Sequence, residues 1–431
     1  MTQRNVPPRG ARVAVVGSGI AGLATAWLLK DSYRVTLFEA GSYFGGHSNT
    51  VDVTINGITH PVDTGFLVHN DLTYPNLIQL FKHLEVDVYA SDMSFGVSIA
   101  DPDVEWAGTD LSTVFAQGRN LIRPKFLLML RDILRFNKNA SRYLSETQRH
   151  PISLEQLLAR ERFGQTMRDW YLLPMAAAIW SAPVKDILEF PAAQFLTFCL
   201  NHRLLQIQER PQWKTVVGGS RRYVQKLVQP LADARLNSPV QRIERLPDSV
   251  LLQSVGGNES FDAVVLACHA PTALALLDAR PQEREVLQSF RYQENRAVLH
   301  TDTRLLPRRK KVWSAWNYLS AKSADQNQPV AVSYLLNQLQ ALPFSQPVIV
   351  TLNPSTEPLP DLIFREFSYE HPILDAAAAK AQTRLPSIQG LDRVWFCGAW
   401  AGYGFHEDGL KAALRVARDF EVNVPWSAVY D

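Results

Sequence analysis

The chain has 431 residues, of which 46% are hydrophobic and 20% charged, with a formal net charge of +2. Such a composition is typical of a globular protein with two or three domains, and it excludes a disordered chain and a strongly basic nucleic-acid-binding protein. Three widely spaced cysteines offer neither a disulfide framework nor a Cys-x-x-Cys metal pair, so we expect a reducing, cytoplasmic environment and no bound metal. Residues 1–10 lack an apolar signal core, and no run approaches about 18 consecutive apolar residues, so neither an export signal nor a membrane-spanning helix is expected.

A nucleotide-binding turn opens the chain. The valine-rich run 13–16 predicts a buried parallel strand, and Gly17, Gly19 and Gly22 follow it with the spacing G-x-G-x-x-G. The first glycine permits the tight turn, the second lets the backbone approach a pyrophosphate, and the third lets the next helix pack close to the sheet. The free N–H groups at the start of that helix would bind the phosphates.

The next stretch discriminates among dinucleotides. A second predicted strand, residues 33–38, ends at Glu39, whose carboxylate can accept both hydroxyl protons of an adenosine ribose; this favours FAD or NAD over NADP. A further glycine pair, Gly45 and Gly46, precedes His47. NAD has no need of a second pair, whereas the diphosphate and ribityl chain of FAD run on past the first turn. The sequence therefore predicts FAD.

At this point the chain resembles the flavin-containing amine oxidase superfamily, which also includes phytoene-desaturase-like and protoporphyrinogen-oxidase-like enzymes. Residues 35–40, of the form V-x-L-x-E-A, and the glycine pair carry the resemblance; the family usually has Arg where this chain has His47. The phrase Tyr-Gly-Phe-His-Glu-Asp-Gly at 403–409 is similar to a branch described only as predicted NAD/FAD-binding proteins, and to the amino-terminal part of plant cyclopropane fatty acid synthases. The resemblance extends over essentially the whole chain.

The resemblance implies an α/β fold: a Rossmann-like FAD-binding domain and a discontinuous substrate domain of mixed sheet and helices. In the family a late strand-glycine-helix unit, here residues 394–414, closes over the flavin, and Asp408 is expected to cap its helix. Residues 61–66 would pass beside the flavin ring, and Val240 would present its backbone to the adenine. The residues thus assigned to FAD are Gly17, Ser18, Gly19, Ile20, Ala21, Gly22, Glu39, Ala40, Gly45, Gly46, His47, Thr64, Gly65, Val240, Gly398, Asp408, Gly409 and Leu410.

Domain boundaries follow from the same pattern. The FAD-binding domain is expected to comprise 10–80, 205–290 and 385–425, and the substrate domain 81–204 and 291–384. The first substrate-domain piece has a mainly helical pattern, and the second alternates like strands at 312–318, 330–336, 348–352 and 362–369. Asn56-Gly57 between two alternating runs predicts a type I′ hairpin turn.

A basic segment, residues 119–143, predicts an amphipathic helix with seven Lys or Arg residues and one acid. Its basic stripe is Arg131, Arg135, Lys138 and Arg142, opposite the apolar face Phe126, Met129, Leu130, Ile133 and Phe136. Two interpretations stay open: a surface helix packed on the core, or a helix that rests on an anionic membrane. The apolar stretches 170–180 and 190–205 are compatible with a membrane contact and also with the core of the substrate domain.

Candidates for catalysis lie near the expected flavin. His406 could act as a base, since histidine titrates near neutrality, or could hydrogen-bond the cofactor or backbone instead. Tyr403, the second catalytic candidate, and Trp400 could wall the substrate cavity or simply pack in the core. His69 is placed in the same cavity, with a structural role as the alternative. Cys397 lies within a predicted buried strand, so we expect FAD to be bound non-covalently.

Three functions compete. The first is an FAD-dependent oxidoreductase of desaturase, isomerase or dehydrogenase type that takes a hydride from an apolar substrate, best a fatty acyl chain. The second is an amine oxidase acting on an amine or polyamine, for which acid clusters are missing in the substrate domain. The third is a non-catalytic FAD-binding partner of a lipid-modifying enzyme. The sequence gives no indication of an oligomeric state.

Overall fold

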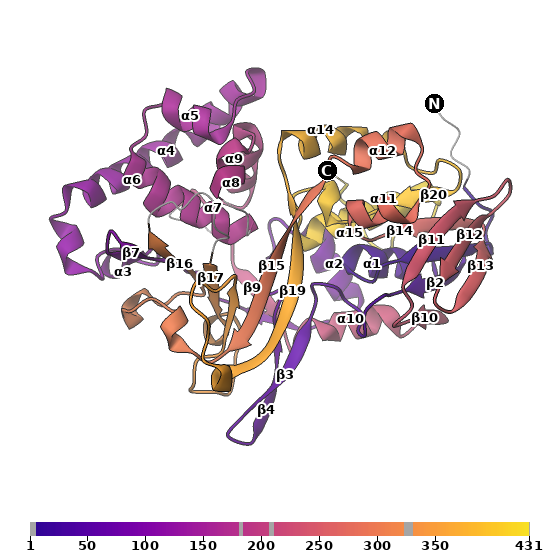
Figure 1. Ribbon diagram of the computed structural model, residues 1–431, viewed down its shortest axis with the longest axis horizontal. Helices are drawn as coiled ribbons and strands as arrows, with labels where there is room; N and C mark the ends of the chain where they lie inside the picture. Colours follow the sequence, from indigo (N-terminus) through magenta and orange to yellow (C-terminus); the bar gives the residue numbers. More distant parts are fainter. Residues whose placement is uncertain (1–5, 181–183, 207–210, 323–330, 431) are drawn as a thin grey trace.

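A computed structural model describes residues 6–180, 184–206, 211–322 and 331–430, arranged in two lobes (Figure 1). The parallel-sheet lobe, on the right in Figure 1, is built on a five-stranded sheet, and the mixed-sheet lobe, on the left, on a seven-stranded sheet beneath helices. The long strands β15 (Arg291–His300) and β19 (Ile363–Ile373) run between the lobes. This confirms the predicted α/β fold class with a discontinuous second sheet.

The five-stranded sheet is entirely parallel. Its order is β10 (Asp233–Arg235), β2 (Arg34–Phe38), β1 (Arg12–Val16), β14 (Ala263–Leu266) and β20 (Val394–Phe396). Four consecutive residues of β14 are fully buried, as expected of a strand covered on both faces. The valine-rich and late strands predicted from the sequence are therefore confirmed. The sheet combines three segments that are distant in the sequence, and the carboxyl ends of its parallel strands lie along one edge.

Helices cover both faces of this sheet. On one face α1 (Ile20–Leu29) packs against α15 (His406–Asp419), and a β-carbon on Gly409 would lie 2.8 Å from Cγ2 of Ile20. The other face carries a three-stranded antiparallel sheet and three helices. These elements are β11 (Val240–Arg245), β12 (Val250–Ser254), β13 (Gly257–Phe261), α11 (Ala270–Leu276), α12 (Pro281–Leu287) and α14 (Ala376–Arg384).

The seven-stranded sheet pairs distant segments. Its order is β19, β15, β18 (Ile349–Leu352), β17 (Ala331–Leu335), β16 (Trp316–Lys322), β7 (Phe95–Asp101) and β8 (Val104–Ala107). The strand predicted at 312–318 begins only at Trp316, because Oδ1 of Asn317 accepts the backbone N–H of Ser314 and closes a turn there. The strand predicted at 362–369 continues to Ile373 because it pairs with β15 along its whole length. Residue 330 of the predicted strand 330–336 lies outside the described residues.

Two smaller sheets complete the strands. The hairpin of β3 (Thr50–Ile55) and β4 (Ile58–Asp63) turns at Asn56 and Gly57, whose φ angles of 51° and 80° confirm the predicted type I′ turn. The second sheet joins β5 (His69–Asn70), β9 (Trp213–Val216) and β6 (Val88–Ala90). In it His69 pairs with Lys214, so a long-range contact fixes the direction of the His69 side chain.

The helical layer contains the basic segment. The helix predicted at 119–143 is α4 (Pro124–Arg149): residues 118–121 form a separate 3₁₀ turn, η1, and proline is well suited to the first helical position. Phe126, Met129 and Phe136 are fully buried, as the predicted apolar face requires. The stretches 170–180 and 190–205 contribute Trp170, Phe195 and their neighbours to the core of this lobe.

The remaining helices are short. They are α2 (Pro75–His83), α3 (Leu111–Val114), α5 (Leu154–Arg160), α6 (Gln165–Met167), the π-turn η2 (Arg168–Leu172), α7 (Leu173–Trp180), α8 (Val184–Glu189), α9 (Ala192–Asn201), α10 (Arg221–Val228) and α13 (Leu336–Leu339). Within the described parts of the chain, every helix is too short or too polar to cross a membrane.

Candidate functional site

One elongated cavity of about 610 Å³ collects residues from both lobes. At one end it is lined by the β1–α1 turn and Glu39, and at the other by side chains of α7, α9 and the seven-stranded sheet. Between them lie the loops 45–47, 64–68 and 398–406. The cavity is therefore shaped for a long ligand that begins at a dinucleotide turn and ends under the mixed-sheet lobe.

The β1–α1 turn fits a pyrophosphate. Gly17 has a φ of 103°, and a β-carbon on Gly22 would lie 1.9 Å from the carbonyl oxygen of Gly17, so neither position accepts a side chain. A β-carbon on Gly19 would meet no atom within 4 Å, so the space in front of the helix is open. No side chain caps α1, which leaves its first N–H groups available to phosphate oxygens.

Glu39 is held as an acceptor beside this turn. One carboxylate oxygen accepts the backbone N–H of Ser18 at 2.9 Å, and the other accepts that of Gly41 at 2.7 Å. Val240 and Ser238 line the cavity at the same end. The hydroxyl of Ser18 also donates to the oxygen that accepts the Ser18 N–H, so the acceptor capacity that remains for a ribose hydroxyl is chiefly on the oxygen beside Gly41. The adenosine half of FAD fits here.

The second glycine pair brings the chain back to the first turn. Gly45 and Gly46 have φ angles of 124° and 58°, and a β-carbon on Gly46 would lie 3.2 Å from Cα of Gly19. A β-carbon on Gly65 would lie 2.2 Å from the carbonyl oxygen of His47, so residues 64–66 and the pair are in close contact. The backbone angle of Gly45 and the close approach at Gly65 require glycine at these two positions, and the left-handed φ of Gly46 favours it there.

His47 replaces the family's arginine with a neutral imidazole. Its ring stacks on Tyr369 with centroids 4.9 Å apart and lies 5.2 Å from the ring of His371. Burial, and then the neighbouring His371, lower the pKa of His47 well below its ordinary value. Its Nε2 is buried and has no hydrogen-bond partner among the described residues. An orphaned polar atom on a residue that lines the cavity fits a site completed by an anionic cofactor.

The closing unit 398–410 divides into lining and supporting residues. Gly398, Tyr403 and His406 line the cavity, whereas Asp408, Gly409 and Leu410 do not. Asp408 accepts the backbone N–H of Phe405 at 3.0 Å and so caps α15, and burial raises its pKa to about 6. Gly409 packs on Ile20 and Leu410 is fully buried, so these three residues position the helix rather than the ligand directly.

His406 is fixed by two hydroxyl groups. Its Nε2 lies 2.9 Å from Oγ of Ser48 and 3.0 Å from the hydroxyl of Tyr223, which also contact each other. Its ring stacks on Phe66 with centroids 3.6 Å apart, and burial lowers its pKa to about 3. His406 is therefore neutral with one nitrogen engaged, and its role as a base stays a prediction.

The other candidate residues differ in whether they line the cavity. Tyr403 lies 5.7 Å from Phe198 between ring centroids and lines the cavity. Trp400 also lines it, but its Nε1 donates to the carbonyl of Cys268 at 3.1 Å and only 2% of its surface is exposed. His69 does not line the cavity: it is 1% exposed and lies behind Phe66, against Phe81. The pairing of β5 with β9 turns it inward, which the local sequence could not reveal.

His371, which sequence analysis did not single out, lines the cavity with a defined tautomer. The backbone N–H of Arg296 donates to Oδ1 of Asn353, so Nδ2 of Asn353 must donate to Oδ1 of Asn295. The amide of Asn295 then donates to Nδ1 of His371 at 2.8 Å. Burial lowers the pKa of His371 to about 4, so the neutral ring carries its proton on Nε2, which has no partner among the described residues.

His202 at the end of α9 has the opposite tautomer. Its Nδ1 donates to the carbonyl of Phe198 at 3.0 Å, and its ring stacks on that of Phe198 at 3.9 Å. Burial lowers its pKa to about 4. Its Nε2 therefore bears a lone pair, so the cavity wall contains a hydrogen-bond donor, His371, and an acceptor, His202.

The rest of the wall in the mixed-sheet lobe is apolar or aromatic. These side chains are Leu67, Val68, Met93, Ile179, Trp180, Phe198, Leu204, Trp213, Trp316, Tyr334, Leu352 and Phe405. Among the described lining residues the carboxylates are Glu39, at the adenosine end, and Glu370, which is half exposed and bonded to His269 at 2.8 Å. No described lysine or arginine lines the cavity.

Cys397, at which the sequence predicts no covalent flavin link, does not line this cavity. Sγ of Cys397 is 3.6 Å from Oγ1 of Thr25, and burial raises its pKa to about 12. Cys397 does not line the cavity, whereas Cys268 does. Burial also raises the pKa of Cys268 to about 12, so neither group is a thiolate near neutrality. This agrees with a non-covalently bound flavin.

Comparisons with known proteins agree with this site. The model of the family described as "Flavin containing amine oxidoreductase" matches residues 20–351. A search of curated proteins found no match. Cyclohexylamine oxidase from Brevibacterium oxydans IH-35A superposes with a TM-score of 0.67 at 15% identity, over 96% of this chain and all of that one.

Two further solved structures share the fold. Wild-type putrescine oxidase bound to putrescine gives a TM-score of 0.66 at 16% identity, covering 96% of this chain and 100% of that one. A CLA-producing fatty acid isomerase from P. acnes gives 0.62 at 16% identity, covering 96% and 99%. With the dinucleotide turn, the second glycine pair and the family match in place, the chain belongs to the flavin-containing amine oxidoreductase family and is an FAD-dependent oxidoreductase.

Proposed function

We propose that this enzyme takes a hydride from a carbon of an apolar substrate, best a fatty acyl chain, in a desaturation, isomerisation or dehydrogenation. The observation that supports this is the wall under the mixed-sheet lobe, where the described lining side chains are aliphatic, aromatic or neutral histidine, apart from Glu370, which is half exposed and paired with His269. Each methylene of an acyl chain buried there contributes about 0.8 kcal/mol. An ammonium group buried among the apolar side chains would instead be desolvated, and the lining carboxylate of Glu370 is half exposed and already paired with His269, so its burial there is unfavourable.

The chain's own residues divide the work around the flavin. Bound FAD supplies the hydride acceptor. Gly19 and Glu39 would hold its pyrophosphate and ribose, while the aromatic wall orients the substrate and excludes water. Nε2–H of His371 donates to an acceptor in the cavity, and the lone pair on Nε2 of His202 can accept a proton or hydrogen bond from the substrate.

An amine is the second candidate substrate, and one observation favours it. The indole rings of Trp180, Trp213 and Trp316 line the cavity, and aromatic faces attract cations. Nε2 of His202 could also accept a hydrogen bond from a neutral amine. Two of the structural neighbours are oxidases named for amines, but at 15% and 16% identity those likenesses support only the fold.

Anaerobic mixing of the FAD-loaded enzyme with an unsaturated fatty acid, putrescine or cyclohexylamine tests the proposal. We expect the fatty acid to bleach the oxidised flavin band, or to return with a shifted double bond in gas chromatography. Bleaching by the amines alone would establish the second candidate instead. An unchanged flavin band and unchanged lipid in every mixture would indicate the non-catalytic role.

A matched pair of variants locates the substrate. Trp316→Glu places a carboxylate in the apolar wall, and Leu359→Glu places one on the surface, where Leu359 is 48% exposed. We expect Trp316→Glu to weaken fatty acid binding about tenfold or more while Leu359→Glu leaves it unchanged. Equal binding by both variants contradicts a lipid site beneath the mixed-sheet lobe.

A further inference from the structure

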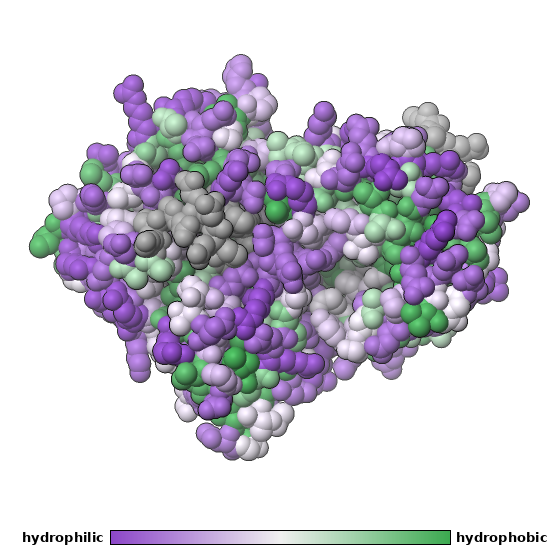
Figure 2. Space-filling model, in the orientation of Figure 1, coloured by the Kyte–Doolittle hydropathy of each residue, from purple (hydrophilic) through white to green (hydrophobic). Residues whose placement is uncertain are grey.

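We propose that the outer end of the mixed-sheet lobe docks on an anionic membrane surface. The docking face comprises the exposed apolar residues Leu111, Leu121, Ile122, Leu127 and Leu128 and the basic residues Arg119, Arg123, Lys125, Lys310 and Lys311. Leu111 is 77% exposed, Leu121 57% and Ile122 83%, which is unusual for side chains of this kind. In Figure 2 hydrophobic side chains project among hydrophilic ones at the left-hand edge, over the lobe that carries α3 and α4 in Figure 1.

The residues of the docking face lie together. Ile122 shares an open hollow on the surface with Asp103, Arg119 and Arg123. The rings of Phe115 and Phe126, 6.0 Å apart, join the ends of α3 and α4 beneath the surface. The 3₁₀ turn η4 (Lys310–Val312) contacts β8, and β8 also contacts α3, so the loop before β16 borders the same face.

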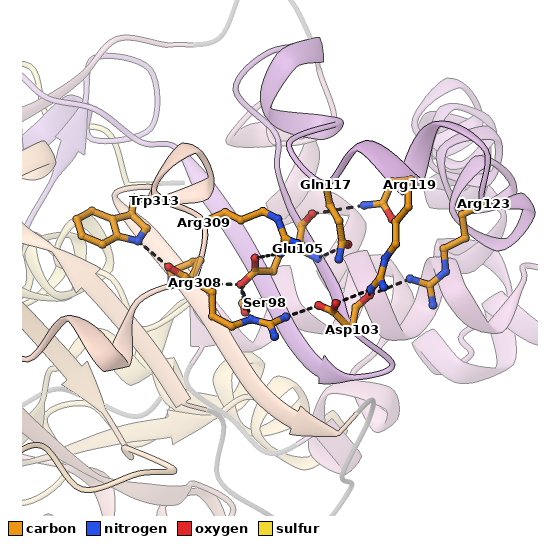
Figure 3. Close-up of polar contacts among 11 residues, drawn as sticks. Ser98, Asp103, Glu105, Gln117, Arg119, Arg123, Arg308, Arg309 and Trp313 are labelled. Carbon is orange, nitrogen blue, oxygen red and sulfur yellow. Dashed lines mark hydrogen bonds and ion pairs between the residues drawn. The ribbon is translucent and has the colours of Figure 1, made fainter.

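Arg119 and Arg123 of the docking face belong to a network of ion pairs and hydrogen bonds (Figure 3). Asp103, in the turn before β8, pairs with both Arg119 and Arg308, and its backbone carbonyl accepts from Arg123 at 2.9 Å. The buried carboxylate of Glu105 accepts from Ser98 at 2.8 Å, from the backbone N–H of Arg308 at 2.8 Å and from the Arg309 guanidinium. Both acids are thereby neutralised, and the basic groups around them are in excess.

Charge complementarity identifies the occupant. Lys125, Lys310 and Lys311 have no ion pair within 4 Å among the described residues, and all three are exposed. By contrast, the stripe predicted from the sequence is largely paired: Arg131 and Arg135 with Asp132, and Arg142 with Glu146 and Glu161. Lysines without an ion-pair partner beside exposed leucine and isoleucine side chains match anionic head groups above an acyl layer, where each cation contributes about 1 kcal/mol.

This inference concerns binding and is independent of the substrate, so its test needs no turnover. The FAD-loaded protein is sedimented with vesicles of phosphatidylcholine alone and of phosphatidylcholine with phosphatidylserine. We expect co-sedimentation with the anionic vesicles only, and release by added salt. Absence of co-sedimentation at low salt overturns the proposal.

Three variants test whether vesicle binding is localised to the docking face or is non-specific. Ile122→Glu and Lys125→Glu alter the face, and Val255→Glu is the matched control: Val255 is 65% exposed at the β12–β13 turn of the other lobe. We expect the first two to weaken vesicle binding about tenfold or more and Val255→Glu to leave it unchanged. Flavin absorbance and melting temperature verify folding.

Two outcomes contradict the docking face. Equal loss in Val255→Glu means that binding is not localised there. If Ile122→Glu changes the molecular mass in light scattering and leaves vesicle binding intact, the face joins copies of this chain and is not a membrane surface.

Discussion

The side-chain amide of Asn295 donates to Nδ1 of His371 at 2.8 Å, and this contact decides which nitrogen of the imidazole carries the proton. Asn295 is itself oriented by Asn353, whose own orientation is dictated by the backbone N–H of Arg296. Because Asn295 and Asn353 come from β15 and the end of β18, two strands of the mixed sheet determine the chemistry of a residue on a third, β19. His371 thus presents a donor, and not an acceptor, to the cavity.

Replacing Asn295 with Asp is expected to invert this arrangement. A carboxylate can only accept, so it favours a proton on Nδ1 of His371, moves the lone pair to Nε2 and raises the pKa of the ring. Long-range ¹H–¹⁵N spectra should show the exchange of tautomer at His371. The signals of His300, whose Nδ1 accepts the backbone N–H of Asp302 at 3.0 Å, serve as the internal control.

The same variant tests the role of His371 in turnover. We expect the rate of flavin reduction in stopped flow to fall about tenfold or more, and its pH profile to shift, whereas a purely structural role predicts lower thermal stability with an unchanged profile. An inverted tautomer with an unaltered reduction rate would show that the donor at Nε2 is not used.

The buried neutral histidines predict that the free energy of unfolding falls at acidic pH. Burial lowers the pKa of His300 from 6.5 to about 4, and its side chain is fully buried with Nε2 2.8 Å from Oγ1 of Thr351. The unfolded chain binds this proton below pH 6.5 and the folded chain does not. The contribution of neutral His300 to the free energy of unfolding is therefore fully present above the unfolded pKa. It is lost as the pH falls from about 6.5 toward 4, by up to about 3 kcal/mol.

His300→Asn provides the measurement for that effect. The asparagine Oδ1 can replace Nδ1 as the acceptor of the Asp302 N–H but does not titrate. We expect a lower free energy of unfolding at every pH but a shallower dependence on pH between about 4 and 6.5 in urea titrations. Parallel slopes for the parent and His300→Asn would contradict the assignment.

Local features of the chain could be predicted from the sequence, and long-range ones could not. The strand, glycine turn and helix of 12–29 depend on neighbouring residues, as does the Asn56-Gly57 turn, because backbone conformation and close approach select glycine there. The cavity wall under the mixed-sheet lobe depends on pairing between distant strands. His371 meets Asn295 across 76 positions, and no local pattern marks either residue.

The same reason explains His69 and the basic stripe. His69 is close to the flavin segment in sequence, but its pairing with Lys214 turns it into the core. The stripe on α4 has the helical spacing that sequence analysis found, yet Glu161, from the end of α5, neutralises Arg142. Tertiary contacts decide which charged side chains are unpaired and which side chains line the cavity, even where the sequence pattern predicts the secondary structure.

The flavin is expected to be released by denaturation. Sγ of Cys397 faces Thr25, and Cys268 keeps its proton because burial raises its pKa to about 12. Acid precipitation of the yellow protein should leave all flavin absorbance in the supernatant, with FAD identified by chromatography. Flavin that stays with the pellet, and moves to a tryptic peptide containing Cys268 or Cys397, would reveal a covalent link.

Glu39→Gln tests the ribose end of the site. Both carboxylate oxygens of Glu39 accept backbone N–H groups, from Ser18 and Gly41, so a glutamine must direct its own NH₂ at one of these donors. One buried N–H then lacks an acceptor and the ribose loses a charge-assisted hydrogen bond, which together weaken FAD binding by about 1.5–3 kcal/mol, or roughly ten- to a hundredfold in Kd. Titration of the apoprotein with FAD, followed by quenching of flavin fluorescence, measures this.

Glu259→Gln is the matched control, because Glu259 pairs with Arg12 and Arg235 at the edge of the sheet and does not line the cavity. If the two variants bind FAD equally well, Glu39 does not contact the ribose and the adenosine half of the site must be reassigned.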